Sequence, residues 1–234
     1  MYAIFKREFK TYFSSPLGYV FLAVFYVLAG LFFVLNNILS GTANMSGVFS
    51  NITIICIILV PLLTMRLLSE DKKQKTDQLL LTSPVSLGNI VLGKFLAAFA
   101  IYAIGLSCTV VYAFVLAVFV NIEVWVIVGS LFGMLLLGAS FIAIGMFISN
   151  LTENQLIAAV LSICIIFGLY IVNSLNGVIS NPILAALLSA ISIYSRYINF
   201  SMGIFNMSDA IYYLSVAAIF GFLTVRVLEK RRWS

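Results

Sequence analysis

Long apolar stretches alternate with short polar ones along most of the chain. Six of these stretches have the length of about twenty residues that a transmembrane helix needs, and they are too long to be strands. They fall at about 17–35, 52–68, 95–120, 125–148, 156–172 and 210–227. The pattern predicts an all-α polytopic membrane protein, in which residues 1–234 form a single transmembrane domain with six transmembrane helices.

Residues 1–14 predict an amphipathic helix that precedes the first span. Its aromatic residues recur at helical spacing on one face, and its basic residues lie on the other. The aromatic face comprises Tyr2, Phe5, Phe9, Tyr12 and Phe13, and the basic face comprises Lys6, Arg7 and Lys10. We expect an interfacial helix that lies in the headgroup plane with its aromatic face toward the lipid.

The segment 69–94, between the second and third spans, is the most strongly charged interior part of the chain. Its mixed-charge first half is followed by the apolar triplet Leu79–Leu81 and then by Pro84. Because a helix usually ends before a proline, Pro84 is expected to divide two short helical pieces. The leucine triplet is too short to span a membrane, so it is buried either in the membrane interface or in an apolar groove of a cytoplasmic partner.

The segment 173–208, between the fifth and sixth spans, is expected to be irregular and to lie on the outer side. Within it, residues 182–200 raise the question of a seventh span. The uninterrupted apolar run there is only about twelve residues long, and a span needs about twenty. Arg196 closes the run. The pattern therefore favours a re-entrant or interfacial segment.

Charge sets the expected orientation. The chain is 63% hydrophobic and 9% charged, with a formal net charge of +5. With six spans, twelve of the thirteen basic residues fall on one side, and only Arg196 falls on the other. The twelve are Lys6, Arg7, Lys10, Arg66, Lys72, Lys73, Lys75, Lys94, Arg226, Lys230, Arg231 and Arg232. Because basic residues favour the cytoplasmic side, both termini are expected in the cytoplasm and the protein in the cell membrane. Anionic membrane lipid then explains the charge without a nucleic acid partner.

The chain lacks residues that several kinds of catalysis, nucleotide binding and ion coupling require. The chain has no histidine, which removes Ser-His and Cys-His catalysis. The stretch GNIVLGKF at 88–95 begins like a phosphate-binding loop, but Phe95 replaces the required hydroxyl residue. We therefore expect no nucleotide, cofactor or metal in this chain. Glu123 and Asp209 at outer helix ends, and Glu153 in an inner turn, are interpreted as solvated or capping residues, which argues against ion coupling.

A motif close to L-L-L-T-x-P-V-S, followed by G-K, occupies residues 79–94. The matching residues are Thr76, Leu79, Leu80, Leu81, Thr82, Pro84, Val85, Ser86, Gly93 and Lys94, preceded by Glu70 and Asp71. With this motif, the basic entry at 6–16 and six spans, the chain resembles permease subunits of ABC transporters of the ABC-2 exporter type. Within that type it is most similar to the branch that includes gliding-motility and copper-enzyme-maturation permeases.

The resemblance implies a cytoplasmic coupling helix that docks on a separate ATP-binding cassette subunit. The residues that would contact this ATPase are Thr76, Asp77, Gln78, Leu79, Leu80, Leu81, Thr82 and Pro84. Two positions depart from the family pattern, because Lys75 replaces a glycine and Gln78 replaces a glutamate, leaving Asp77 as the neighbouring carboxylate.

The resemblance also implies a function and an assembly. Two permease chains, identical or related, would work with two ATPase subunits that bind ATP and Mg²⁺, and would export an amphipathic, lipid-like, peptide or polysaccharide substrate. From the residues alone, two other functions stay open. One is a membrane scaffold or insertion subunit with a partner that is not an ATPase, and the other is an ion-independent channel or carrier.

Overall fold

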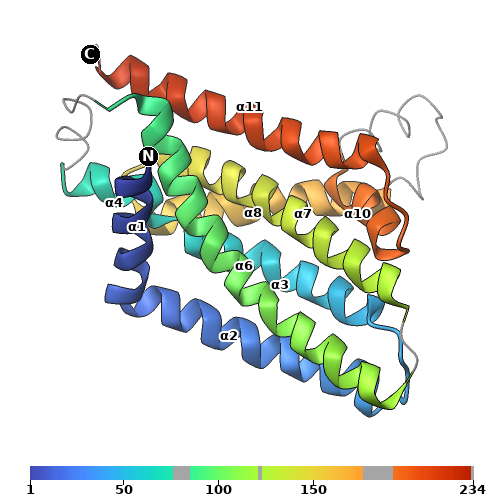
Figure 1. Ribbon diagram of the computed structural model, residues 1–234. Coiled ribbons are helices and arrows are strands. Elements are labelled where there is room, and N and C mark those ends of the chain that lie inside the picture. The colour runs from blue at the N-terminus through green and yellow to red at the C-terminus, as the bar shows by residue number, and fades with distance from the viewer. Residues whose placement is uncertain (76–84, 121–122, 176–191, 233–234) are drawn as a thin grey trace.

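The computed structural model describes residues 1–75, 85–120, 123–175 and 192–232. Within these residues every regular element is helical, and long helices run side by side in one bundle (Figure 1). Six of the described helices are long and apolar enough to cross a membrane. These findings confirm the predicted all-α polytopic fold with six spans.

The chain begins with two helices that meet at a sharp bend. Helix α1 (Tyr2–Ser14) is followed by Ser15, whose extended backbone breaks the helix, and α2 (Pro16–Phe33) starts at the next residue. Proline suits the first turn of a helix because its missing N–H has no intrahelical partner there. Helix α2 continues as a short π-helix, η1 (Val34–Ile38). The first span therefore extends slightly beyond the predicted 17–35.

Helix α3 (Ser46–Thr64) begins earlier than the predicted start at residue 52, and α4 (Arg66–Lys73) follows it almost directly. The predicted spans left residues 36–51 between them, but the asparagines there bond to nearby backbone groups. Asn36 donates to the carbonyl of Phe32 at 2.9 Å, and the side chain of Asn44 accepts from the N–H of Ser46 at 2.8 Å. These bonds leave only a short connection between η1 and α3.

The second half of the chain supplies α6 (Leu87–Phe119), α7 (Val124–Leu151), α8 (Gln155–Leu175), α10 (Ile193–Ser201) and α11 (Met207–Arg232). Helix α6 starts well before the predicted third span at 95, so residues 87–94 are helical. The segment 173–208, predicted to be irregular, contains the nine-residue helix α10. A helix of nine residues is too short to cross a membrane. Residues 176–191 lie outside the described part.

Helix α7 forms the centre of the bundle and packs against α3, α4, α6, α8, α10 and α11. Gly129 and Gly133 allow its close approach to α10. A Cβ atom on Gly133 would lie 2.7 Å from the Cβ of Phe200, and one on Gly129 would lie 2.5 Å from the Phe200 carbonyl oxygen. This small-residue pair therefore packs within the chain, as small residues do between membrane helices.

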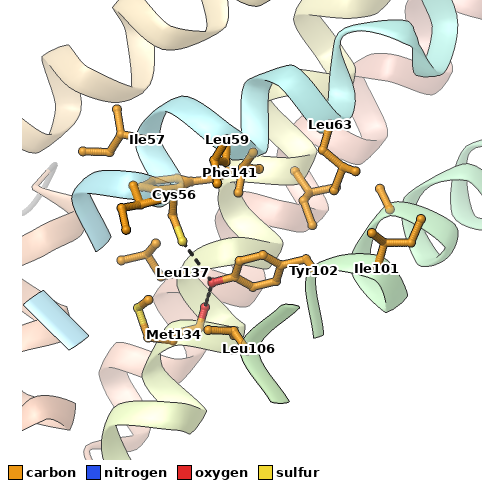
Figure 2. Packing of buried hydrophobic residues seen from close by; sticks show 14 of the residues in the cluster. Cys56, Ile57, Leu59, Leu63, Ile101, Tyr102, Leu106, Met134, Leu137 and Phe141 are labelled. Carbon is orange, nitrogen blue, oxygen red and sulfur yellow. Dashed lines mark hydrogen bonds between the residues drawn. The ribbon is translucent and has the colours of Figure 1, made fainter. Parts of the chain in front are cut away.

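Figure 2 shows the core where α3, α6 and α7 meet around Tyr102. The Tyr102 side chain is fully buried, and its hydroxyl donates to the carbonyl oxygen of Met134 at 2.8 Å. The Cys56 thiol donates to the same hydroxyl oxygen at 3.8 Å. In lipid, dispersion contacts and interhelical hydrogen bonds hold helices together, because the tails are as apolar as the side chains. Tyr102 supplies both.

Both termini lie at the same end of the bundle, together with α1 and α4, and α10 lies at the other end (Figure 1). We call the first end the α4 end and the second the α10 end. The α4 end also contains the start of α6 and the last turns of α11. An even number of spans requires this arrangement.

Candidate functional site

The residues predicted to contact an ATPase lie outside the described part of the chain. They are Thr76, Asp77, Gln78, Leu79, Leu80, Leu81, Thr82 and Pro84. The residues on either side are described, and they place both ends of this segment at the α4 end of the bundle. The candidate site is therefore the group of side chains on α1, α4 and α6 that lies next to the two described ends of the segment 76–84.

Lys94 stands at the centre of this group. It lies in the second turn of α6, and only 1% of its side chain is exposed. Its Nζ atom lies 2.7 Å from Oδ2 of Asp71 on α4 and 3.0 Å from Oε1 of Glu8 on α1. A buried lysine is tolerated only when it is paired in this way. One ammonium group thus joins three helices that are far apart in sequence.

Further ion pairs surround Lys94 and balance the charge. Arg7 Nη2 lies 2.6 Å from Glu8 Oε1, and Arg66 Nε lies 2.7 Å from Glu70 Oε2. Arg66 also donates to Oγ of Ser15, at the bend between α1 and α2, at 2.8 Å. We call the six charged residues the Lys94 cluster; they are Arg7, Glu8, Arg66, Glu70, Asp71 and Lys94. They line a small polar cavity of about 220 Å³.

The Lys94 cluster was only partly foreseen from the sequence. Lys94, Glu70 and Asp71 were recognised as family-motif residues, but Glu8 was not assigned a role. Glu8 is the one acidic residue in the first turns of a basic helix, four positions after Ile4 and four before Tyr12. That spacing places the three on one face of a helix. This spacing was the feature of the sequence that could have indicated a third face of the helix, one that packs against the rest of the protein.

Helix α1 uses this third face to dock on the bundle. Tyr12 is 3% exposed, and its hydroxyl donates to the carbonyl oxygen of Leu63 at 2.8 Å. The assignment of Tyr12 to a lipid-facing surface was therefore wrong, because its hydroxyl satisfies a carbonyl at the end of α3. Burial, with a smaller contribution from Glu8, holds the pKa of the Tyr12 phenol well above its usual range, so it remains a donor. Gly93 on α6 admits Ile4, whose Cγ2 would lie 3.0 Å from a Cβ there.

The other predicted residues of α1 remain at its surface. Phe5 stacks on Phe9 with ring centroids 5.8 Å apart, and Phe9 contacts Phe13 at 5.1 Å, which forms a half-buried aromatic row. Tyr2 is 73% exposed. The basic residues Lys6, Arg7 and Lys10 are exposed. This division between aromatic and basic surfaces suits a helix at a membrane interface, and its contact with lipid stays a prediction.

The position of Lys94 also bears on nucleotide binding. Residues 88–94, which resemble the start of a phosphate-binding loop, lie inside α6. A phosphate-binding loop uses free backbone N–H groups and an available lysine. Here the lysine is held by Asp71 and Glu8, and the backbone is helical. The geometry supports the rejection of a phosphate-binding loop at this position.

Lys75, the last described residue before the segment 76–84, has a backbone φ of +57°. Glycine is favoured in this left-handed region, which explains physically why the resemblance implies a glycine here. We expect Lys75→Val to lower the free energy of unfolding by about 1 kcal/mol or more, because branched residues fit this region poorly. Lys75→Gly should be neutral or slightly stabilising. Unfolding in detergent, followed by tryptophan fluorescence, measures both.

The matched control for Lys75→Val is Lys73→Val, because Lys73 is exposed in the last turn of α4. A loss of stability at residue 73 as large as the loss at residue 75 would contradict the backbone explanation.

A second buried ion pair lies at the α10 end. Asp209, in the first turn of α11, is 3% exposed, and its Oδ1 lies 3.0 Å from Arg196 Nη1 on α10. Asn199 donates to its other oxygen at 2.7 Å. The interpretation of Asp209 as a solvated or capping residue was wrong, since it anchors α10 to α11. The signal was Arg196, the single basic residue assigned to that side.

Comparison with known proteins adds independent information. A family model described as "ABC-2 family transporter protein" matches residues 2–229, which is nearly the whole chain. No curated protein gives a significant match. The family match agrees with the described helices that are long enough to span a membrane, and with the resemblance that the motif at 79–94 indicated. The chain is a multi-pass membrane protein and belongs to the ABC-2 transporter family.

Proposed function

We propose that this chain is the permease subunit of an ATP-driven exporter, and that residues 76–84 receive movement from a separate ATP-binding subunit. The observation that carries the proposal is the Lys94 cluster. Asp71 lies in the helix before the segment 76–84, Lys94 lies in the second turn of the helix after it, and their side chains form an ion pair at 2.7 Å. A force on the segment would therefore act on two helices, α4 and α6, that this ion pair holds together.

The Lys94 cluster gives such a force a path into the bundle. Through Lys94 it reaches α6, whose 33 residues run through the bundle. Through Glu8 it reaches α1, and through Arg66 and Ser15 it reaches the bend where α2 begins. Paired charges in a protected site act as stiff connections, because separating them is costly at low dielectric. Movement of α4 is thus expected to move α1 and α6 together.

The proposal assigns the α4 end to the cytoplasm and the protein to the cell membrane. Eleven basic residues with described side chains are found at that end, whereas Arg196 lies at the α10 end. The eleven are Lys6, Arg7, Lys10, Arg66, Lys72, Lys73, Lys75, Lys94, Arg226, Lys230 and Arg231. Basic residues are retained on the cytoplasmic side during insertion, which supports cytoplasmic termini.

The proposed assembly contains two permease chains and two ATPase subunits, with ATP and Mg²⁺ on the ATPases. Each chain has one segment of the 76–84 type, so each would engage one ATPase. An amphipathic substrate, such as a lipid-like molecule, peptide or polysaccharide, agrees with spans whose charged side chains, in the described residues, lie near the helix ends. A carrier that takes energy from an ion gradient usually has central ionisable groups.

Co-purification tests the proposal directly. The chain is expressed with a candidate soluble ATPase, chosen among the products of neighbouring genes by the presence of a complete phosphate-binding loop. We expect a stable complex in detergent and ATP hydrolysis that exceeds the rate of the soluble protein alone. Hydrolysis that is unchanged by the membrane chain would contradict the proposal, and a stable complex with a partner that is not an ATPase would favour the scaffold function.

A further inference from the structure

A shallow groove opens on the surface of the bundle between the first turns of α6 and residues 217–225 in the middle of α11. Its volume is about 310 Å³, and every residue that lines it is Gly, Ala, Val, Leu, Met or Phe. Val91 and Met146 are buried beneath it, whereas Leu92 and Phe222 are 50% and 56% exposed. The two helices contact each other, and both reach the α4 end (Figure 1). The groove therefore lies on the outside of two spans, where lipid tails are the solvent.

Two glycines keep this groove open. A Cβ atom built on Gly88 of α6, or on Gly221 of α11, meets no atom within 4 Å apart from the adjoining residues and backbone of its own helix. The side chains of the chain itself thus leave room at both positions. Phe95 and Phe222 line the same space. An extended, flexible hydrocarbon fits a narrow apolar space of this kind.

A cation lies beside the groove. The guanidinium carbon of Arg226 lies 4.9 Å from the centroid of the Phe222 ring, one turn away on α11. Arg226 bonds to Glu229 at 2.8 Å through Nη1, and its side chain is 62% exposed. Such an exposed ion pair is weak. The planar guanidinium has five N–H donors, so it can also bind a phosphate.

We propose that this groove binds one acyl chain of an anionic phospholipid, and that the lipid phosphate contacts Arg226. Lipid tails and the groove are equally apolar, so specific binding must come from shape and from the headgroup. The glycines provide the shape and Arg226 provides the charge. This resident lipid is distinct from any exported substrate. It contacts the same turns of α6 that carry Lys94 on another face, and so it stiffens the helix to which the Lys94 cluster is attached.

Native mass spectrometry of the delipidated chain in detergent, titrated with phosphatidylglycerol, tests the shape requirement. Gly221→Leu fills the groove, and we expect it to weaken the tightest binding event at least tenfold. Gly168→Leu is the matched control, because Gly168 lies on α8 and a Cβ atom at that position would also meet no other atom within 4 Å. It should leave that affinity unchanged. Gly88→Leu fills the groove from α6 and replaces Gly221→Leu if that variant fails to fold.

Arg226→Gln tests the headgroup contact. Attraction of an anionic lipid by one basic residue corresponds to a factor of about five in affinity. We therefore expect the preference for phosphatidylglycerol over phosphatidylcholine to fall about fivefold, with phosphatidylcholine binding unchanged. Lys10→Gln, which removes an exposed cation of α1 that does not line the groove, should retain the preference.

Three results would overturn the lipid site. They are equal lipid binding by Gly221→Leu and Gly168→Leu, no preference of the unmodified chain for the anionic lipid, and a change of oligomeric mass in Gly221→Leu with lipid binding intact. The last result would assign the groove to contact with a second copy. These measurements need neither the ATPase nor a known orientation, so their failure would leave the proposed function standing.

Discussion

The double substitution Leu79→Asp and Leu80→Asp is expected to abolish substrate-linked ATP hydrolysis by the permease–ATPase complex. If the leucines fill an apolar groove of the ATPase, each contributes about 1.5–3 kcal/mol, and a buried unpaired carboxylate costs more. A loss of about 3 kcal/mol or more weakens docking by at least about a hundredfold. ATPase activity at increasing concentrations of the soluble subunit measures this loss.

The six-span fold should survive the double substitution, because the sequence places residues 79 and 80 in the segment between the predicted second and third spans. The adjacent pair Ile38 and Leu39 offers a matched control. Both are exposed apolar residues, 60% and 72% exposed; Ile38 is the last residue of the first span and Leu39 follows it, at the α10 end. Ile38→Asp with Leu39→Asp should leave ATPase stimulation intact. Normal stimulation by the variant at 79 and 80 would show that this segment does not dock.

The arrangement of spans was predictable because it depends on local properties of the chain. Apolar runs of about twenty residues specify membrane helices, and basic residues mark one end of the bundle. The ends of the helices were less accurate. The polar residues between the predicted first two spans include Asn36 and Asn44, which satisfy backbone groups next to helix ends, and the predicted cytoplasmic segment 69–94 includes residues 87–94, which belong to α6.

The Lys94 cluster was harder to predict because it depends on contacts between distant parts of the chain. Glu8 and Lys94 are 86 positions apart, and no local pattern specifies that pairing. The same holds for Tyr12 with Leu63 and for Arg196 with Asp209. From their immediate neighbours, Tyr12 was assigned to lipid and Asp209 to solvent or a helix cap. Each is instead buried by the packing of another helix, and a buried polar group requires a partner.

Lys94→Met is expected to lower the free energy of unfolding by about 3 kcal/mol, and to uncouple ATP hydrolysis from transport. Removing one member of a buried ion pair leaves its partners uncompensated, which typically costs about 3–5 kcal/mol. The lower end applies because Glu8 and Asp71 keep side-chain exposures of 13% and 19%. Unfolding in detergent measures the stability, and vesicles with the ATPase measure coupling. Lys73→Met, at an exposed position of α4, is the control.

The triple variant Glu8→Gln, Asp71→Asn and Lys94→Met separates a coupling role from a purely structural one. Removing all three charges should recover most of the lost stability, because neutral packed groups often replace a buried ion pair at little cost. Coupling should remain impaired, since no charge then ties α1 and α4 to α6. A triple variant that regained both stability and coupling would show that the Lys94 cluster serves only to hold the fold. The isolated unmodified chain is expected to bind no nucleotide, because carboxylates occupy Lys94 and residues 88–94 are helical, so Lys94→Met should leave nucleotide binding at the same baseline.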